Sequence, residues 1–365
     1  MRNNPGTVND DIDLAATVLS LGLTTPRELL HVLHRAWCDS KAPLREVLVS
    51  SGLVKQSELD RLELSQTART TIDSFLPAAG RRYTQERPLG AGGMGVVVQV
   101  KDRALGRSVA LKHLSPESSA DDETVGTLLT EARIAGMLEH PNIMPIYDVG
   151  ALPGGEPYYT MRLMDTMSLA DILGILREGN PEAAREFPFV RRMRIFLQIC
   201  YGVDYAHGRG VIHRDIKPDN IRVGRHGEAQ LCDWGLARAD GLPDLPLRQA
   251  MQQALARGEK NPCIVIGSPN YMSPEQAMGR NDEVGSWSDV YGLGAVLYEV
   301  LTLAPPVQGT DTVTIFQKVE RGEIVPVQDK APERRIPPEL ADLCMSCLEL
   351  RREDRPPDVR VLCRV

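Results

Sequence analysis

The stretch VIHRDIKPDN, residues 211–220, places a dense set of polar and charged side chains directly after two β-branched apolar residues. The groups that could take part in chemistry are His213, Arg214, Asp215, Lys217 and Asn220. The apolar run ahead of them favours a short buried strand, so the polar groups should gather on the loop that follows it. The stretch therefore indicates a reaction site and not an ordinary surface turn.

The stretch GAGGMGVV, residues 90–97, has the spacing G-x-G-x-x-G-x-V. Glycines at this spacing let backbone N–H groups close over phosphates without obstruction by side chains. Strand-like runs lie on both sides, at 83–90 and 95–102, whereas a dinucleotide-binding turn would open a helix. The context predicts a phosphate-binding hairpin and disfavours a Rossmann site.

Lys112 ends the strand-like run VALK, and Glu131 falls in a helical pattern that begins near Thr124. A cation on a buried strand is unfavourable unless it is paired, so Lys112 requires a carboxylate and a phosphate as partners. Glu131 is the candidate carboxylate. The alternative is an exposed lysine and an unrelated surface glutamate, and without the other motifs that alternative would be preferred.

Phosphoryl transfer accounts for these groups together. It needs a carboxylate that orients the attacking hydroxyl, oxygen ligands for Mg²⁺, and cations over the transferred group. Asp215 meets the first need. Asn220 meets the second together with Asp233, which follows the apolar run AQL in the motif CDWG. Lys217 and Lys112 meet the third.

Taken together, GAGGMGVV, VALK, HRDIKPDN, DWG and SPE resemble the signature motifs of protein kinases, in the bacterial branch of the Hanks-type serine/threonine kinases. The resemblance covers about residues 83–365. It implies an ATP-dependent enzyme that transfers the γ-phosphate of Mg-ATP to serine or threonine hydroxyls of proteins in bacterial signalling, with autophosphorylation. ATP and Mg²⁺ would be its cofactors, with Mn²⁺ as an alternative ion.

The same resemblance assigns roles to the loop residues. Asp215 would be the catalytic base, and Lys217 would steady the γ-phosphate. Asn220 and Asp233 would hold the metal ion. Lys217 also resembles the pattern of serine/threonine kinases more than that of tyrosine kinases.

The nucleotide would lie between the glycine-rich hairpin and the hinge. Lys112, paired with Glu131, would position the α- and β-phosphates, Met161 would be the gatekeeper, and Leu163 and Met164 would offer hinge backbone groups. The expected nucleotide-contacting positions are Gly90, Ala91, Gly92, Gly93, Gly95, Val97, Ala110, Lys112, Glu131, Met161, Leu163 and Met164.

Other positions resemble the structural framework of the family. Ser268, in GSPNYMSPE, resembles the hydroxyl residue that bonds the catalytic Asp and Lys. Glu275 resembles an anchor that pairs with Arg355, and Asp289 resembles the residue that ties the catalytic-loop backbone to the following helix.

Cys232 and Trp234 lie on either side of Asp233, the expected metal ligand. Trp234 stands where the family has Phe, and its aromatic ring can keep the apolar packing under the helix that carries Glu131. Cys232 either faces the nucleotide or is a buried apolar thiol, and the second interpretation is favoured.

The segment between Asp233 and Glu275 is long and contains LPLRQAMQQALARGEK, whose composition predicts an inserted helix of about three turns. No Ser, Thr or Tyr occurs between Gly235 and Ser268. Arg214 ordinarily suggests control by a phosphorylated residue in this segment. We therefore expect the segment to be ordered by its own helix or by a partner.

The pattern along the chain predicts an α+β fold: a bilobal kinase preceded by a small all-α module. Residues 80–165 are strand-rich and would form the N-lobe, and residues 166–365 are mainly helical and would form the C-lobe. The chain ends at Val365, where the last helix of the family would still be running. We expect that helix to be cut short or the native chain to continue.

Residues 1–79 repeat at an offset of 30, with helical runs separated by Gly22 and Gly52 and with the cap candidates Thr25 and Ser57. This predicts a small helical repeat module with a docking, oligomerising or regulatory role. It resembles the modules at the front of type II secretion and pilus ATPases, some of which bind cyclic dinucleotides. A docking module without a ligand is the favoured interpretation.

The composition is that of an ordinary globular chain of 365 residues with a formal net charge of −7, so no nucleic-acid partner is indicated. Seven scattered cysteines favour reduced thiols over a disulfide framework. Cys344 and Cys347 form one CxxC, for which a buried helix is favoured over a metal site. Protein substrates and ATP are the expected partners, with a homodimer as a further option.

No signal-peptide pattern and no apolar run long enough to cross a bilayer is evident. We expect a cytoplasmic chain, or the cytosolic part of a longer protein whose membrane anchor lies outside this sequence. Two alternatives to an active protein kinase stay open: a pseudokinase that binds nucleotide as a scaffold, and a small-molecule phosphotransferase.

Overall fold

The computed structural model describes residues 14–15, 18, 24–36, 43–56, 82–92, 95–114, 122–164, 167–257 and 264–364. By its internal contacts the chain divides into two units, Met1–Arg82 and Tyr83–Val365. Each unit has its own apolar core, and each is described separately.

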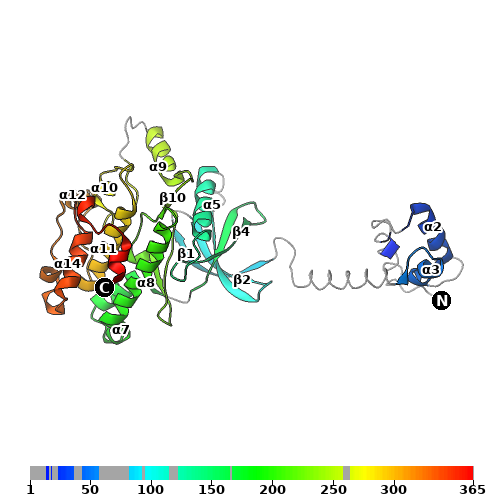
Figure 1. Cartoon of the computed structure of the whole chain (residues 1–365), viewed down its shortest axis with the longest axis horizontal. Helices are drawn as coiled ribbons and strands as arrows, with labels where there is room; N and C mark the ends of the chain where they lie inside the picture. Colours follow the sequence, from blue (N-terminus) through cyan, green and yellow to red (C-terminus); the bar gives the residue numbers. More distant parts are fainter. Residues whose placement is uncertain are drawn as a thin grey trace. The chain divides into compact units, whose positions relative to one another are not determined.

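The first unit contains helices α2 (Pro26–His34) and α3 (Leu44–Ser50), shown in blue in Figure 1. Thr25 caps α2 as expected, because its hydroxyl accepts a hydrogen bond from the Glu28 N–H at 3.3 Å and the Glu28 carboxylate accepts one from the Thr25 N–H at 3.0 Å. Gly52 follows α3 with φ of +73°, which ends the helix. The predicted cap at Ser57 lies outside the described residues.

The strand-rich half of the second unit is one antiparallel sheet of five strands in the order β1-β2-β3-β5-β4. Its members are β1 (Tyr83–Gly92), β2 (Gly95–Asp102), β3 (Arg107–His113), β4 (Ile146–Ala151) and β5 (Pro157–Met161). Helix α5 (Asp122–Gly136) packs on β4 and β5, as Figure 1 shows. The strands and the helix predicted for this region are confirmed.

Alternation along the strands decides which side chains face the rest of the molecule. Val98 and Val100 of β2 are buried together with Val109 and Leu111 of β3 on one face of the sheet. Ala110 and Lys112 therefore share the opposite face of β3, since successive side chains of a strand point to opposite sides.

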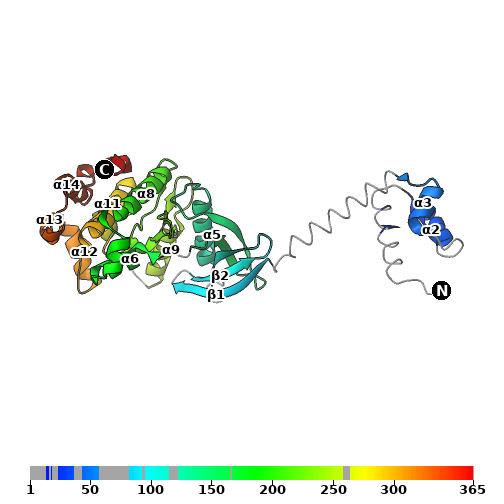
Figure 2. The same cartoon turned by 90° about the horizontal axis from the view of Figure 1, so that it is seen from below.

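The second half of this unit is mainly helical (Figure 2). Its α-helices are α6 (Leu169–Arg177), α7 (Pro181–Glu186), α8 (Phe189–His207), α9 (Leu245–Ala256), α10 (Pro274–Ala277), α11 (Ser286–Thr302), α12 (Thr312–Arg321), α13 (Val327–Lys330) and α14 (Pro338–Cys347). The short 3₁₀ helices are η3 (Pro218–Asn220), η4 (Pro332–Arg334), η5 (Arg352–Asp354) and η6 (Val359–Arg364). Helix α11 is buried along most of its length and packs against α8 and α14.

Short strands connect these helices to the polar loops. They are β6 (Met167–Ser168), β7 (Val211–Ile212), β8 (Ile221–Val223), β9 (Ala229–Leu231) and β10 (Arg238–Ala239). A strand-rich half followed by a helix-rich half is the predicted α+β architecture, which is confirmed.

The structure also bears on the inserted helix, the CxxC and membrane-spanning helices. Helix α9 has 12 residues, which confirms the helix predicted between Asp233 and Glu275. Cys344 and Cys347 are buried in α14, where a Cβ at Gly294 would lie 2.5 Å from the Cβ of Cys347. The CxxC therefore forms a close helix contact, as the favoured interpretation held. In the described ranges, no helix is both long and apolar enough to cross a bilayer.

Candidate active site

A cavity of about 450 Å³ lies between the sheet and the helix-rich half of the second unit. It is lined by Arg87, Leu89, Gly90, Val97, Ala110, Met144, Met161, Arg162, Leu163, Met164, Arg222 and Cys232. Residues of β1, β2, β3 and β5 form one side, and β8 and the residue before Asp233 form the other. The cavity therefore lies between the two halves, and residues from the glycine-rich, VALK and CDWG motifs line it.

Half of the expected nucleotide-contacting positions line this cavity: Gly90, Val97, Ala110, Met161, Leu163 and Met164. Ala91, Gly92 and Gly95 belong to the adjoining end of the β1–β2 hairpin, where Gly92 pairs with Gly95. Lys112 and Glu131 lie near the cavity without lining it. Gly93 is outside the described residues.

Gly95 illustrates why this hairpin needs glycine. Its φ is +132°, and a Cβ added there would lie 2.5 Å from the backbone oxygen of His113 on β3. Any side chain would collide with the neighbouring strand, so only glycine allows the hairpin to fold this closely.

Lys112 and Glu131 form a buried ion pair between β3 and α5. The Lys112 Nζ lies 2.8 and 2.9 Å from the two Glu131 carboxylate oxygens. The Tyr159 hydroxyl donates to Glu131 at 2.7 Å, and Asp233 Oδ1 lies 4.0 Å from the Lys112 Nζ. One ammonium group therefore serves two carboxylates.

The electrostatics of this trio indicate a shortage of positive charge. Burial raises the pKa of Glu131 above its ordinary value, the Lys112 ammonium opposes the rise, and the nearby Asp233 charge adds to it. Burial lowers the pKa of Lys112, but Glu131 and Asp233 together outweigh burial, so this pKa is raised. Both directions follow from two carboxylates near one ammonium, with Lys112 and Glu131 buried and Asp233 partly exposed.

The loop that begins at His213 is held through its backbone N–H groups. Asp289 of α11 accepts hydrogen bonds from the N–H groups of His213 and Arg214, both at 2.8 Å, as the sequence predicted. Although burial raises the pKa of Asp289, the bonds from His207 and His213 lower it overall, which favours the carboxylate. Arg214 has φ of +66°, an unfavourable conformation for a side-chain-bearing residue, so these bonds maintain a strained turn.

Asp215 has one occupied oxygen and one free oxygen. Its Oδ2 lies 2.8 Å from the Lys217 Nζ and accepts a bond from the Asn220 Nδ2 at 3.2 Å. Its Oδ1 is buried and has no hydrogen-bond partner within the part of the chain that the structure describes. Lys217 also donates to Ser268 at 2.6 Å, which confirms the lysine half of the contact expected for that serine.

Asn220 and Asp233 come from neighbouring strand ends. The Cys232 N–H donates to the Asn220 backbone oxygen at 2.9 Å, which joins the end of η3 to the residue before Asp233. Asp233 has φ of +63° and a side chain that is 43% exposed, and it points toward Lys112. The two oxygen-bearing side chains predicted to hold a metal are thus brought to one region.

The family model described as "Protein kinase domain" matches residues 83–363. The chain belongs to the protein kinase family. Catalytic-loop, glycine-rich and DWG motifs thus occur here in a kinase domain that spans most of the sequence.

The kinase domain has bacterial relatives. The chain is 35% identical to the serine/threonine-protein kinase PknD of Chlamydia trachomatis over 286 residues, and 34% identical to a protein of the same name from Protochlamydia amoebophila over 297 residues. The alignments cover 75% and 79% of this chain but 30% of each relative. The chain therefore spans about a third of the length of the curated relatives it matches. The resemblance to bacterial Hanks-type kinases is confirmed.

Cys232 and Trp234 flank Asp233 in the kinase motif CDWG. Trp234 is buried in the same apolar cluster as Ile134 and Ala135 of α5, and its ring centroid lies 4.6 Å from that of His213, so apolar packing under α5 is retained. Cys232 combines the two interpretations, because it lines the cavity and is also a largely buried thiol, whose Sγ donates to the Asn220 backbone oxygen at 3.1 Å. Burial raises the pKa of Cys232 to about 12.

Several residues that line the kinase cavity were not expected from the motifs: Arg87, Leu89, Met144 and Arg222. The sequence pattern around Arg222 could have indicated that its side chain points away from the main core. It lies between Ile221 and Val223, which are buried in the main core, so alternation along β8 turns Arg222 the other way. Met144 sits just before β4 and carries no motif that would have singled it out.

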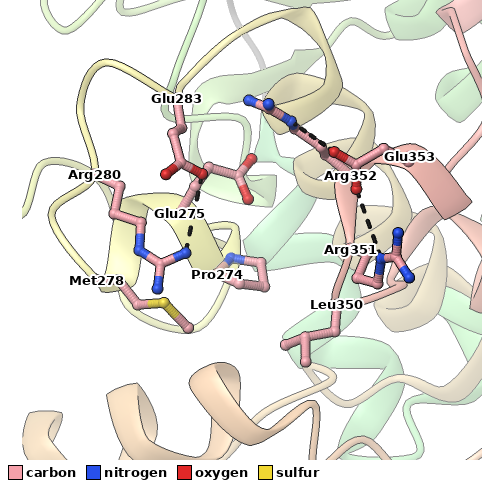
Figure 3. A pocket seen from close by; sticks show the side chains of 9 residues that line it. All are labelled: Pro274, Glu275, Met278, Arg280, Glu283, Leu350, Arg351, Arg352 and Glu353. Carbon is pink, nitrogen blue, oxygen red and sulfur yellow. Dashed lines mark hydrogen bonds and ion pairs between the residues drawn. The ribbon is translucent and has the colours of Figure 1, made fainter.

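A second cavity of about 330 Å³ lies near α10 and η5 of the kinase domain (Figure 3). Its lining is Pro274, Glu275, Met278, Arg280, Glu283, Leu350, Arg351, Arg352 and Glu353, none of which is a predicted site residue. Glu275 accepts bonds from Arg355 at 2.9 Å to each oxygen and from Ser288 at 2.6 Å. Burial raises the pKa of Glu275, but these bonds lower it overall. The predicted Glu275–Arg355 pair is confirmed.

Proposed function

We propose that this chain is an ATP-dependent protein kinase that transfers the γ-phosphate of Mg-ATP to serine or threonine hydroxyls of proteins, its own included. The observation that carries the proposal is Asp215. Its buried Oδ1 has no partner among the described residues, although its Oδ2 is fixed by Lys217 and Asn220. A buried carboxylate oxygen without a donor is unfavourable, and the hydroxyl of an acceptor would satisfy it.

Asp215 then acts on the acceptor. Its Oδ1 would accept the hydrogen bond of the attacking hydroxyl and orient the oxygen toward the γ-phosphate. It would receive the proton as the bond from that oxygen to the γ-phosphorus forms and the bond from the γ-phosphorus to the leaving ADP breaks. Lys217, held by Ser268, lies beside it and stabilises negative charge on the transferred group. The serine/threonine preference is supported by this Lys217–Ser268 contact and by the names of the relatives.

The residues present fit a nucleotide. A volume of about 450 Å³ is within the usual range of small-molecule sites, and Val97, Ala110 and Met161 give it the apolar walls that a purine ring requires. Leu163 and Met164 would offer backbone groups to the base. The glycines at 90, 92, 93 and 95 would bring backbone N–H groups to the phosphates.

The residues also fit a divalent cation. Glu131 and Asp233 share the single Lys112 ammonium, so the region carries surplus negative charge, and Asn220 and Asp233 offer the oxygen ligands that Mg²⁺ prefers. When bound, Mg²⁺ would bridge phosphate oxygens and neutralise charge during transfer, and Mn²⁺ could replace it. Lys112, oriented by Glu131, would bind the α- and β-phosphates.

The remaining assignments belong to the same proposal. Residues 80–165 and 166–365 would act as the N-lobe and C-lobe, and residues 1–79 as a docking or regulatory module. The kinase would work in the cytoplasm, either as this chain or within a longer membrane-anchored protein, on protein substrates and as a monomer or homodimer.

The test is transfer of radiolabel from γ-labelled Mg-ATP to a generic protein acceptor by wild type and by Asp215→Asn. We expect the variant to lose at least about a hundredfold in rate, as for removal of a general base, while it still binds ATP in a thermal-shift assay. ATP binding without transfer by wild type would support a pseudokinase. Labelling of an aminoglycoside in preference to protein would support a small-molecule phosphotransferase.

A further inference from the structure

Arg214, adjacent to Asp215, makes an ion pair that the sequence did not predict. Its Nη1 and Nη2 donate to the two carboxylate oxygens of Asp244, at 2.7 and 2.8 Å, and its Nε donates to the Leu236 backbone oxygen. The Arg214 side chain is 3% exposed and that of Asp244 is 19% exposed. A bidentate pair of this kind is directional and strong, and each of the three Arg214 side-chain nitrogens donates one hydrogen bond.

Asp244 also begins helix α9. Its Oδ1 accepts a hydrogen bond from the Leu247 N–H at 3.3 Å, in the first turn of that helix. One carboxylate therefore fastens the start of α9 to the catalytic loop. The Arg214 N–H in turn donates to Asp289 of α11, so these bonds connect the start of α9 to a buried helix of the helix-rich half.

The segment that contains α9 has an apolar core of its own. Ala254 of α9 is buried with Ile264 and Ile266, and Leu236, Leu247 and Ala250 pack against them. This cluster joins the two described ends of the segment, before and after the helix. The segment is therefore folded on itself and fastened at Asp244.

Helix α9 also packs against α5, the helix that carries Glu131 (Figure 1). The Gln249 Nε2 donates to the Thr124 hydroxyl at 3.0 Å, and a Cβ at Gly126 would lie 3.3 Å from the Leu245 side chain. Glycine inside a helix is less favourable than alanine by about 1 kcal/mol. The short distance to Leu245 shows how closely α9 approaches α5 at this position.

From these contacts we propose that Asp244 is a positioning residue: its built-in carboxylate on Arg214 seats α9 against α5, so that Glu131 holds Lys112 without phosphorylation of the segment. The inference deepens the proposed kinase function and rests on it. Since no Ser, Thr or Tyr occurs between Gly235 and Ser268, no hydroxyl in that stretch could supply the anion instead. Asp244 supplies permanently a charge that a phosphate would supply on demand.

The test compares wild type, Asp244→Asn and Asp244→Glu after phosphatase treatment. Asparagine keeps a cap for Leu247 but removes the charge, whereas glutamate keeps the charge. We expect phosphatase-treated wild type to keep its full kcat. We expect Asp244→Asn to lose about tenfold or more in kcat, as for loss of a charge-assisted bond, and Asp244→Glu to recover part of that loss. Asp282→Asn, an exposed acid in the turn before α11, should behave as wild type.

Amide hydrogen exchange gives a readout that does not depend on activity. We expect faster exchange in α9 and α5 in Asp244→Asn, and no change in Asp282→Asn. Gln249→Ala, which removes the bond to Thr124, should give a smaller increase confined to α5, and the exposed control Gln253→Ala should give none. Unchanged exchange and kcat in Asp244→Asn would overturn the proposal, as would loss of wild-type activity after phosphatase treatment. If wild type transfers no phosphate at all, the proposed function fails, while the exchange data still decide whether Asp244 positions α5.

Discussion

Two buried ion pairs in the kinase domain have nearly the same geometry and opposite electrostatic outcomes. Lys112 meets Glu131 at 2.8 Å, and Arg355 meets Glu275 at 2.9 Å. The pKa of Glu131 is raised, chiefly by burial, whereas burial of Glu275 is outweighed by its bonds to Arg355 and Ser288 and its pKa is lowered. A short distance between charges therefore does not decide how well a buried carboxylate is stabilised.

Burial and a second carboxylate make the difference. Each glutamate accepts two bonds from its cation and one from a hydroxyl, so the number of donors does not distinguish them. Glu131 shares its cation with Asp233, so the group as a whole has too little positive charge. A pair that is complete within the protein serves the fold, and a pair that is left incomplete is suited to a ligand that brings the missing charge.

The largest effect is expected when the complete pair is broken. Arg355→Met leaves Glu275 buried without its cation, and we expect the free energy of unfolding to fall by about 3–5 kcal/mol in urea denaturation. The double variant Glu275→Met with Arg355→Met removes both charges and should recover much of the loss. If the single variant were as stable as wild type, the two pairs would not differ as described.

Breaking the incomplete pair should mainly affect activity. Lys112→Met removes a cation from the proposed phosphate site, and we expect kcat/KM to fall about a hundred- to a thousandfold, as for loss of one electrostatic donor. The raised pKa of Glu131 lets it take up a proton, and Tyr159 stays as a donor, so the unfolding free energy should change less than in Arg355→Met. Equal destabilisation by both substitutions would remove the distinction.

The contributions of the two glutamates to the free energy of unfolding should change with pH in opposite directions. We expect this effect to be smaller than those of Arg355→Met and Lys112→Met. The lowered pKa of Glu275 means that its contribution is complete above the ordinary value of 4.5 and is lost as the pH falls through the folded-state pKa. The raised pKa of Glu131 means that its ionisation weakens the fold as the pH rises from 4.5 through the folded-state pKa.

This can be measured by denaturation of wild type, Glu275→Gln and Glu131→Gln between roughly pH 3 and 7. The advantage of wild type over Glu275→Gln should shrink as the pH falls. The stability of Glu131→Gln relative to wild type should increase as the pH rises. The same slope for both variants would contradict the assignment.

The sequence predicted those parts of the fold that depend on local pattern. Alternation and glycine spacing are local, so β1, β2 and β3 and the face of Ala110 and Lys112 could be read directly. Motif positions such as Asp289, Glu275 and Arg355 could be placed through the family resemblance. The inserted helix α9 followed from composition alone.

The parts that were not predicted depend on contacts between distant segments. Asp244 sits among leucines and prolines in GLPDLPL, residues 241–247, and nothing local marks it as the partner of Arg214. Arg222 and Met144 line the cavity because of how β8 and the start of β4 pack across it, and no motif includes them. Cys232 could not be placed in the cavity wall from the sequence, because its position there and its bond to Asn220 depend on contacts between separate segments.

The positive φ angles of Arg214 and Asp233, at +66° and +63°, also bear on how this domain could be engineered. A left-handed conformation costs roughly 1–2 kcal/mol for a residue with a side chain, and glycine would relieve it. A selection for heat resistance alone would therefore be drawn to Asp233, where it would exchange chemical competence for thermal endurance, whereas glycine at Arg214 would also break the pair with Asp244. Directed evolution of this domain should keep both positions constant and search elsewhere for gains.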